Sequence, residues 1–281
     1  MKEIEVSKIV DVVEELCIKA ACDLDESVEN CLKEWQKKEE SEFGKYSFEQ
    51  ILENVAYARK ENLALCQDTG VAVFFVDVGQ EVHIKGGGLE DAINEGVRRG
   101  YTKGYLRKSM VNDPVFNRKN TTDNTPAVIH WNIVPGDQLR IQILPKGGGS
   151  ENMGRLAMLK PSDGLPGIKD FVLKAVKDAG GNPCPPIVVG IGIGGTMEKT
   201  TILAKKALSR VIGSPNPDER YAKLEQELLE EINKTGIGPQ GLGGRVTALA
   251  VHIEFYPAHI TGLPVAVNLN CHAARHAEAT L

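Results

Sequence analysis

Three of the six cysteines lie in segments that are typical of loops, where a thiol can meet a metal or a substrate. Cys66 stands in the run LCQDTG, Cys184 in NPCPP, and Cys271 directly after an apolar run that is typical of a strand. Thiolates bind soft metals, but the tight CxxCxxC run of many iron–sulfur proteins is missing here. Three distant cysteines could still hold a four-iron cluster and leave one iron as a Lewis acid for a carboxylate and a hydroxyl group.

A zinc site is the competing interpretation at the end of the chain. We expect a short helix from His272, and such a helix would place His272 and His276 on one face, close to Cys271. This site would lack a fourth ligand.

The other three cysteines are predicted to be packing residues. Cys17 continues the three- and four-residue apolar spacing of a helix, Cys22 lies well round that helix, and Cys31 belongs to the same helical region. A cytoplasmic chain keeps such thiols reduced, so no disulfide is expected.

Glycine is enriched, with 29 residues in 281, and it gathers in blocks that indicate loops built from backbone. Residues 190–195 match GxGxxG between a strand and a helix, which could bind a dinucleotide, but the acidic residue expected about 20 positions later is missing. Residues 146–152, KGGGSEN, could turn backbone N–H groups toward an anion or a cluster, or form only a mobile turn.

The elements that position these residues alternate between helices and strands. We expect helices over residues 3–40, a helix opened by a capping box at Ser47, and a strand pair at 71–78 and 82–85. A hairpin is expected from 127–134 and 139–144. The sequence predicts a mixed α/β fold with a helical amino-terminal region, 1–62, and a cluster-binding α/β body with a mixed sheet, 63–281. No linker is found within the body, so we expect it to form one continuous domain.

Composition excludes several classes of protein. With 33 basic and 38 acidic residues the net charge is −5, which argues against nucleic acid or an anionic membrane as the partner. No apolar run approaches the roughly 20 residues of a membrane span, and the start of the chain lacks the features of a signal peptide, so we expect a cytoplasmic protein.

Six motifs in order along the chain resemble the class I iron–sulfur fumarate hydratases, a family that includes L-tartrate dehydratase. They are ALCQDTG at 64–70, NTTDNTPA at 120–127, KGGGSEN at 146–152, NPCPP at 182–186, GIGIGGT at 190–196 and NCH at 270–272. The length is similar to that of the family's separate alpha subunit.

The resemblance implies a [4Fe–4S] cluster held by Cys66, Cys184 and Cys271, with the fourth iron open to a small dicarboxylate. It also implies that Gln67, Arg107 and Gly149 bind the substrate, and that Asp68 and His259 take part in catalysis. The remaining cationic and proton-transfer groups of the family belong to a beta subunit, so we expect a hetero-oligomer such as a heterotetramer.

The function expected from the sequence is reversible hydration of fumarate to L-malate. The first alternative is dehydration of L-tartrate to oxaloacetate, with the same cofactor and partner. Two further alternatives are a non-catalytic iron–sulfur sensor or scaffold, and a nucleotide-binding oxidoreductase that would rest on the GxGxxG run alone.

Overall fold

The computed structural model describes all residues from Met1 to Leu281 and divides them into two compact units. Unit 1 comprises residues 1–25, 55–148 and 275–281, and unit 2 comprises residues 26–54 and 149–274. Helices and strands alternate in both units, so the expected mixed α/β class with a helical amino-terminal region is confirmed. No helix combines the length and the apolar character that crossing a membrane requires.

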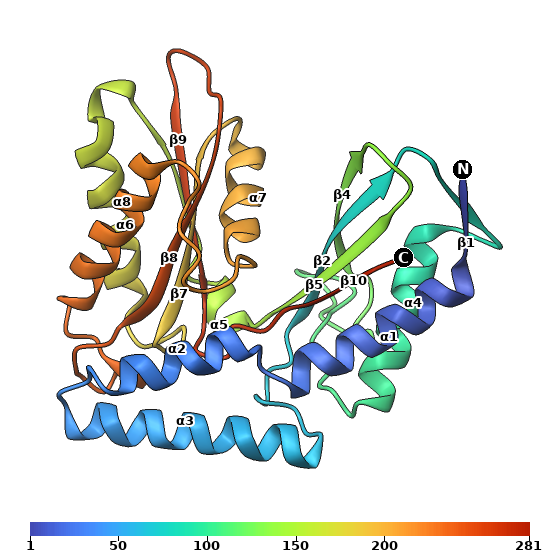
Figure 1. The fold of residues 1–281 in the computed structure, drawn as a ribbon, viewed down its shortest axis with the longest axis horizontal. Helices are drawn as coiled ribbons and strands as arrows, with labels where there is room; N and C mark the ends of the chain where they lie inside the picture. Colours follow the sequence, from blue (N-terminus) through green and yellow to red (C-terminus); the bar gives the residue numbers. More distant parts are fainter. The chain divides into compact units, whose positions relative to one another are not determined.

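Unit 1 is built on a four-stranded mixed sheet in the order β10-β5-β2-β4 (Figure 1). A separate parallel pair joins β1 and β3. The elements of this unit are β1 (Lys2–Glu5), α1 (Val6–Cys22), β2 (Val71–Gly79), β3 (Val82–Lys85), α4 (Leu89–Lys103), β4 (Val128–Val134), β5 (Leu139–Lys146) and β10 (Ala277–Thr280).

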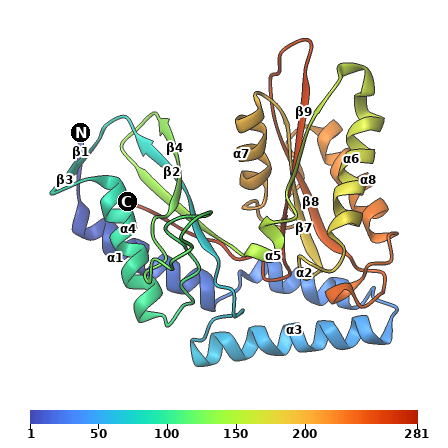
Figure 2. The same cartoon turned by 180° about the vertical axis from the view of Figure 1, so that it is seen from behind.

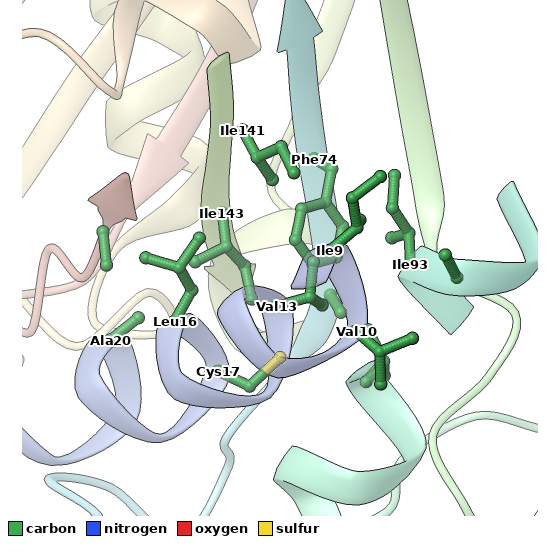
Figure 3. Close-up of a cluster of buried hydrophobic side chains, with 14 of the residues drawn as sticks. Ile9, Val10, Val13, Leu16, Cys17, Ala20, Phe74, Ile93, Ile141 and Ile143 are labelled. Atoms are coloured by element: carbon green, nitrogen blue, oxygen red, sulfur yellow. The ribbon is translucent and has the colours of Figure 1, made fainter. Parts of the chain in front are cut away.

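The core of unit 1 lies between this sheet and helices α1 and α4, as Figure 3 shows. Cys17 is 1% exposed and belongs to this core, which confirms the packing role predicted for it. The two helices approach closely because glycines of α4 face α1. A Cβ atom added at Gly100 would lie 2.7 Å from the Cβ of Cys17, so a larger residue would push the helices apart.

Unit 2 contains a second four-stranded mixed sheet, in the order β6-β9-β7-β8. Helices α6 and α8 cover one face and α7 covers the other (Figure 2). The elements are α2 (Glu26–Gln36), β6 (Arg155–Leu159), α6 (Gly164–Ala179), β7 (Ile187–Gly194), α7 (Met197–Ala207), α8 (Glu219–Asn233), β8 (Ala248–Tyr256) and β9 (Leu263–Asn270), with single turns of 3₁₀-helix at Pro161–Asp163 and Pro239–Gly241. Two helices contain a unit boundary, α3 (Glu42–Glu61) and α5 (Gly148–Glu151).

Several expectations about individual elements are wrong. Residues 272–276 form no helix, and the chain ends in strand β10, which pairs with β5. The expected hairpin does not form either, because β2 lies between β4 and β5 and pairs with both. β2 and β3 are not partners, since β3 pairs with β1. Ser47 lies inside α3, where its hydroxyl donates to the carbonyl oxygen of Phe43 rather than capping the helix.

Candidate functional site

The Cys66 segment, residues 66–70, lies in unit 1 between α3 and β2. The Cys66 thiol is half-buried and donates to Oε1 of Gln67 at 3.5 Å. Both oxygens of the Asp68 carboxylate accept backbone N–H groups: Oδ1 from Gly70 at 3.1 Å and Oδ2 from Gly148 at 2.8 Å. Asp68 is therefore held in a fixed orientation beside the glycine loop.

Strand pairing brings that glycine loop to the Cys66 segment. β2 starts where the antiparallel β5 ends, with Val71 opposite Lys146. Gly70 has a φ of 81°, and a Cβ atom there would lie 2.7 Å from the backbone of Lys146. A glycine is therefore required for the two segments to meet.

The segment that carries Arg107 is tied to the same place. The Thr69 hydroxyl donates to the Arg107 carbonyl oxygen at 3.0 Å. Asn124, which is fully buried, donates to the Gly70 carbonyl oxygen at 3.2 Å and accepts from the backbone N–H of Ser109 at 2.7 Å. The Arg107 side chain itself is exposed. Asn124 lies in the NTTDNTPA motif, whose positioning role the sequence alone did not reveal.

In unit 2 the structure brings Cys184 and Cys271 to the same end of the sheet. Cys184 precedes β7 and Cys271 follows β9, which is antiparallel to β7. His272, next to Cys271, donates its backbone N–H to the Cys184 carbonyl oxygen at 3.3 Å. Cys184 has a φ of 55°, in the left-handed region that residues other than glycine rarely adopt.

Two further residues shape this end of the sheet. Gln240, from the loop 236–244, donates its side-chain N–H to the Pro185 carbonyl oxygen at 2.7 Å and lies 3.1 Å from Nδ1 of His272. A Cβ atom at Gly149 would lie 3.0 Å from the carbonyl oxygen of Asn182, so this glycine packs against the NPCPP segment. Gln240 carried no signal in the sequence.

His259 lies at the opposite end of the same sheet. It belongs to the loop between β8 and β9, and the eight residues of β9 separate this loop from Cys271. At about 3.3 Å per residue, an eight-residue strand spans roughly 25 Å. Nδ1 of the exposed His259 ring accepts the backbone N–H of Thr261 at 3.2 Å, which leaves Nε2 for another partner. Within one chain, His259 and the two cysteines are not brought together.

The other cysteines are poor ligands in this structure. Burial raises the pKa of Cys17 and of Cys22, and it raises the pKa of Cys31 to about 11. These thiols stay protonated at neutral pH, whereas a metal ligand must be a thiolate. None of the six cysteines forms a disulfide.

The GxGxxG run serves packing of a helix on a strand. In β7 the isoleucines point to the core shared with α6 and α8, and the glycines alternate with them. A Cβ atom at Gly190 would overlap the carbonyl oxygen of Ala204, and one at Gly192 would overlap that of Thr200. The glycines therefore allow α7 to lie directly on the sheet, and no nucleotide is needed to explain them.

The thiols of Cys66 in unit 1 and of Cys184 and Cys271 in unit 2 are of the chemical type that binds iron–sulfur groups. All three are at least partly exposed, Cys66 in the loop between α3 and β2, Cys184 shortly before β7, and Cys271 directly after β9. Buried polar atoms without a hydrogen-bond partner gather in the sequence around Cys271: Asn268 Oδ1, Asn270 Nδ2, Arg275 Nε and Nη1, and His276 Nδ1. Buried polar groups are normally paired, so these atoms, of Asn268 and Asn270 in unit 2 and of Arg275 and His276 in unit 1, leave hydrogen-bonding capacity in each unit for a bound polar group. The zinc alternative loses its basis, because His272 and His276 share no helix.

Known proteins are similar to this chain over nearly its whole length. The profile of the family described as fumarate hydratase (fumerase) matches residues 10–280. A chain of Methanocaldococcus jannaschii, provisionally named L(+)-tartrate dehydratase subunit alpha, is 46% identical over 278 residues, or 96% of both chains. L(+)-tartrate dehydratase subunit alpha of Escherichia coli K12 is 35% identical over 288 residues, covering 99% of this chain and 94% of the relative.

Hydration of fumarate and dehydration of tartrate both make or break a carbon–oxygen bond with water, so the matches define a class of hydro-lyases. The chain belongs to the fumarate hydratase family.

Proposed function

We propose that this chain is the alpha subunit of an iron–sulfur hydro-lyase that acts on a small dicarboxylate, with L-tartrate as the first candidate. The choice of L-tartrate as substrate rests on the similarity over 96% of both chains to a relative named for L(+)-tartrate dehydratase. Our sequence-based expectation put fumarate and L-malate first. The family description keeps that reaction as the second candidate.

The proposed cofactor is a [4Fe–4S] cluster, with the thiolates of Cys66, Cys184 and Cys271 as its ligands. When bound, such a cluster supplies an iron that acts as a Lewis acid toward the hydroxyl group of the substrate. The shared end of β7 and β9 supports this assignment for Cys184 and Cys271. For Cys66 the support is its accessible thiol beside a rigidly held polar segment.

The chain's own residues would bind and orient the substrate. Arg107 is an exposed cation suited to a substrate carboxylate, and Gln67 and Gly149 would contact the same molecule. Asp68 accepts two backbone N–H groups, which fix the direction of its carboxylate, so its proposed role is to orient the proton-transfer group.

His259 would contribute to catalysis from a second alpha chain. The length of β9 keeps it from the Cys271 end of its own chain, and a general acid or base must reach within about 3 Å of its proton. Two alpha chains in one complex agree with the expected heterotetramer with two beta subunits. The relatives named subunit alpha support a heteromeric assembly.

Substrate profiling tests the proposal. The complex of this chain with its beta subunit is reconstituted anaerobically with iron and sulfide and assayed on L-tartrate, L-malate and fumarate. We expect the highest kcat/KM for L-tartrate. A higher kcat/KM for fumarate or L-malate would instead identify the interconversion of fumarate and L-malate as the reaction.

Serine variants test the ligand set in the same complex. Cys66→Ser, Cys184→Ser and Cys271→Ser should each lower both iron content and turnover, whereas Cys17→Ser, in the core, serves as the control that keeps the cluster. Full iron content and full turnover in all three variants would refute the proposal that these cysteines bind the cluster. Normal iron with no lyase activity on any dicarboxylate would indicate a sensor or scaffold instead.

A further inference from the structure

Arg275 is a buried arginine four positions after the third proposed ligand cysteine. Arg275 is 2% exposed, and it lies in unit 1 two positions before the first residue of β10. Nη2 donates a hydrogen bond to the main-chain carbonyl oxygen of Asp68 at 3.0 Å. Nε and Nη1 are also buried and have no hydrogen-bond partner.

This guanidinium carries a positive charge without a matching hydrogen-bonded anion. Arginine stays protonated in proteins, and burying a charge costs free energy that only a paired and hydrogen-bonded partner offsets. The nearby Asp68 carboxylate is not that partner, because Nε and Nη1 make no hydrogen bond to it, and its oxygens accept the N–H groups of Gly70 and Gly148 instead. A bound anion would therefore supply the negative charge that the Arg275 guanidinium lacks.

We propose that Arg275 is a positioning residue that fixes the main chain of Asp68 and offers its Nε and Nη1 donors to an anion bound beside residues 66–70. The inference rests on the proposed function. Two anionic groups of that function would accept these donors: the thiolate-ligated cluster and the carboxylate of the substrate. Both require N–H donors and positive charge from the protein, and the experiment below distinguishes them.

Tyr101 provides a matched control without charge. It is 1% exposed, and its hydroxyl donates to the carbonyl oxygens of Gly70 at 3.0 Å and Thr69 at 3.2 Å. Tyr101→Phe removes main-chain support from the same loop as Arg275→Met but leaves the buried charge in place. A purely structural role for Arg275 predicts similar behaviour of the two variants.

The experiment measures ligand-induced changes in Tm for the complex of this chain with its beta subunit. Wild type, Arg275→Met, Arg275→Lys and Tyr101→Phe are compared without cluster, after anaerobic cluster reconstitution, and after addition of succinate to the reconstituted complex. Succinate has no hydroxyl group to lose and no double bond to hydrate, so it reports binding alone. Iron content is measured in parallel.

We expect Arg275→Met to lower the Tm of the cluster-free complex no more than Tyr101→Phe does. Binding to the folded state raises Tm, and the rise caused by the anion that Arg275 faces should fall in Arg275→Met to less than half of the wild-type rise. Tyr101→Phe should keep the full rise. A loss in the reconstitution step identifies the cluster, and a loss only with succinate identifies the substrate carboxylate.

Equal rises for wild type and Arg275→Met in both steps would overturn the proposal. If Arg275→Met does not fold, Arg275→Lys decides, because it keeps the charge but loses the forked donors, and a rise equal to wild type would then overturn it. A wild-type complex that neither takes up iron nor responds to succinate refutes the proposed function itself and, with it, the anion assigned to Arg275.

Discussion

The separation of His259 from Cys184 and Cys271 within one chain predicts that two alpha chains share each catalytic centre. The strand between His259 and Cys271 spans roughly 25 Å, many times the reach of a hydrogen bond. Two inactive alpha chains should therefore restore activity when they are combined. One carries Cys184→Ser and keeps His259, and the other carries His259→Asn and keeps all cysteines.

The magnitude follows from counting sites in a complex with two alpha chains. In a complex that contains one copy of each variant, one site has intact cysteines and receives His259 from the other chain, and the second site has neither. We expect about half of the wild-type turnover from this complex, since two-fold symmetry makes the two sites equivalent in the wild type. A complex of two His259→Asn chains should lose on the order of 10²–10⁴-fold, the usual contribution of a general acid or base.

The assay uses two affinity tags, one on each alpha chain, so that sequential purification isolates the mixed complex with its beta subunits. The control places both substitutions on one chain and pairs it with a wild-type chain. If His259 acts across chains, this control is nearly inactive; if it acts within its own chain, the control keeps about half of the turnover and the first mixture is inactive. The second pattern would refute the shared centre, and full activity of His259→Asn would remove His259 from catalysis.

Three other predictions concern packing, pH and air. Gly192→Ala should lower the free energy of unfolding by about 1–3 kcal/mol or more in a denaturant titration, because the new methyl group overlaps the carbonyl oxygen of Thr200. Gly262→Ala is the control: its Cβ atom would lie 3.8 Å from its nearest neighbour, so the free energy of unfolding should change by less than about 0.5 kcal/mol. Although burial acts to raise the pKa of Glu39, backbone N–H donors, including that of Arg245, hold the pKa of this carboxyl below its usual value. The contribution of Glu39 to stability is therefore present above the unfolded pKa of about 4.3 and is lost as pH falls through the lower folded pKa. Glu39→Gln should lower the free energy of unfolding by about 1–3 kcal/mol at pH 7 and should make it depend less on pH in the acid range. Finally, the reconstituted complex should lose its cluster absorbance and its turnover within hours in air, because an iron without a thiolate ligand is open to oxidants; unchanged spectra and turnover would count against the open iron.

Much of the local structure could be predicted, because it depends on patterns within short segments. The apolar spacing that includes Cys17 predicts one face of α1, and this face is buried against α4 and the sheet. The alternation of apolar and polar residues over 139–144 predicts a strand, and these residues lie in strand β5. Periodicity works in these cases because the same face of the element is buried whichever element covers it.

Strand partners could not be predicted in the same way. Residues 127–134 and 139–144 are adjacent strands with a turn between them, which favours a hairpin. In the structure β2 occupies the place between them and pairs with both, and its nearly continuous apolar run, residues 71–76, is largely buried at this central position. The chain end shows the same limit: residues 272–281 are too few for an isolated helix, and pairing of Ala277–Thr280 with β5 decides their structure.

The candidate site shows which part of function can be predicted from motifs. Motifs identified Cys66, Cys184 and Cys271 but not the hydrogen bonds that hold their segments, which come from residues distant in sequence such as Gln240 and Asn124. They also gave no sign that His259 is a strand's length away from Cys271. Distances of this kind depend on the order and direction of strands, which no single motif encodes.

The charges of this chain bear on the proposal that a partner subunit completes the site. A dicarboxylate brings two negative charges, and Asp68 adds a third at the place where backbone N–H groups already hold it. Of the cations proposed to meet the substrate, Arg107 is exposed, and Arg275 adds a buried charge only where its anion is the substrate carboxylate. One exposed cation provides little binding energy in water, because screening weakens it. We therefore expect the proposed beta subunit to supply further positive charge, and substrate affinity should fall when cationic residues of that subunit are removed.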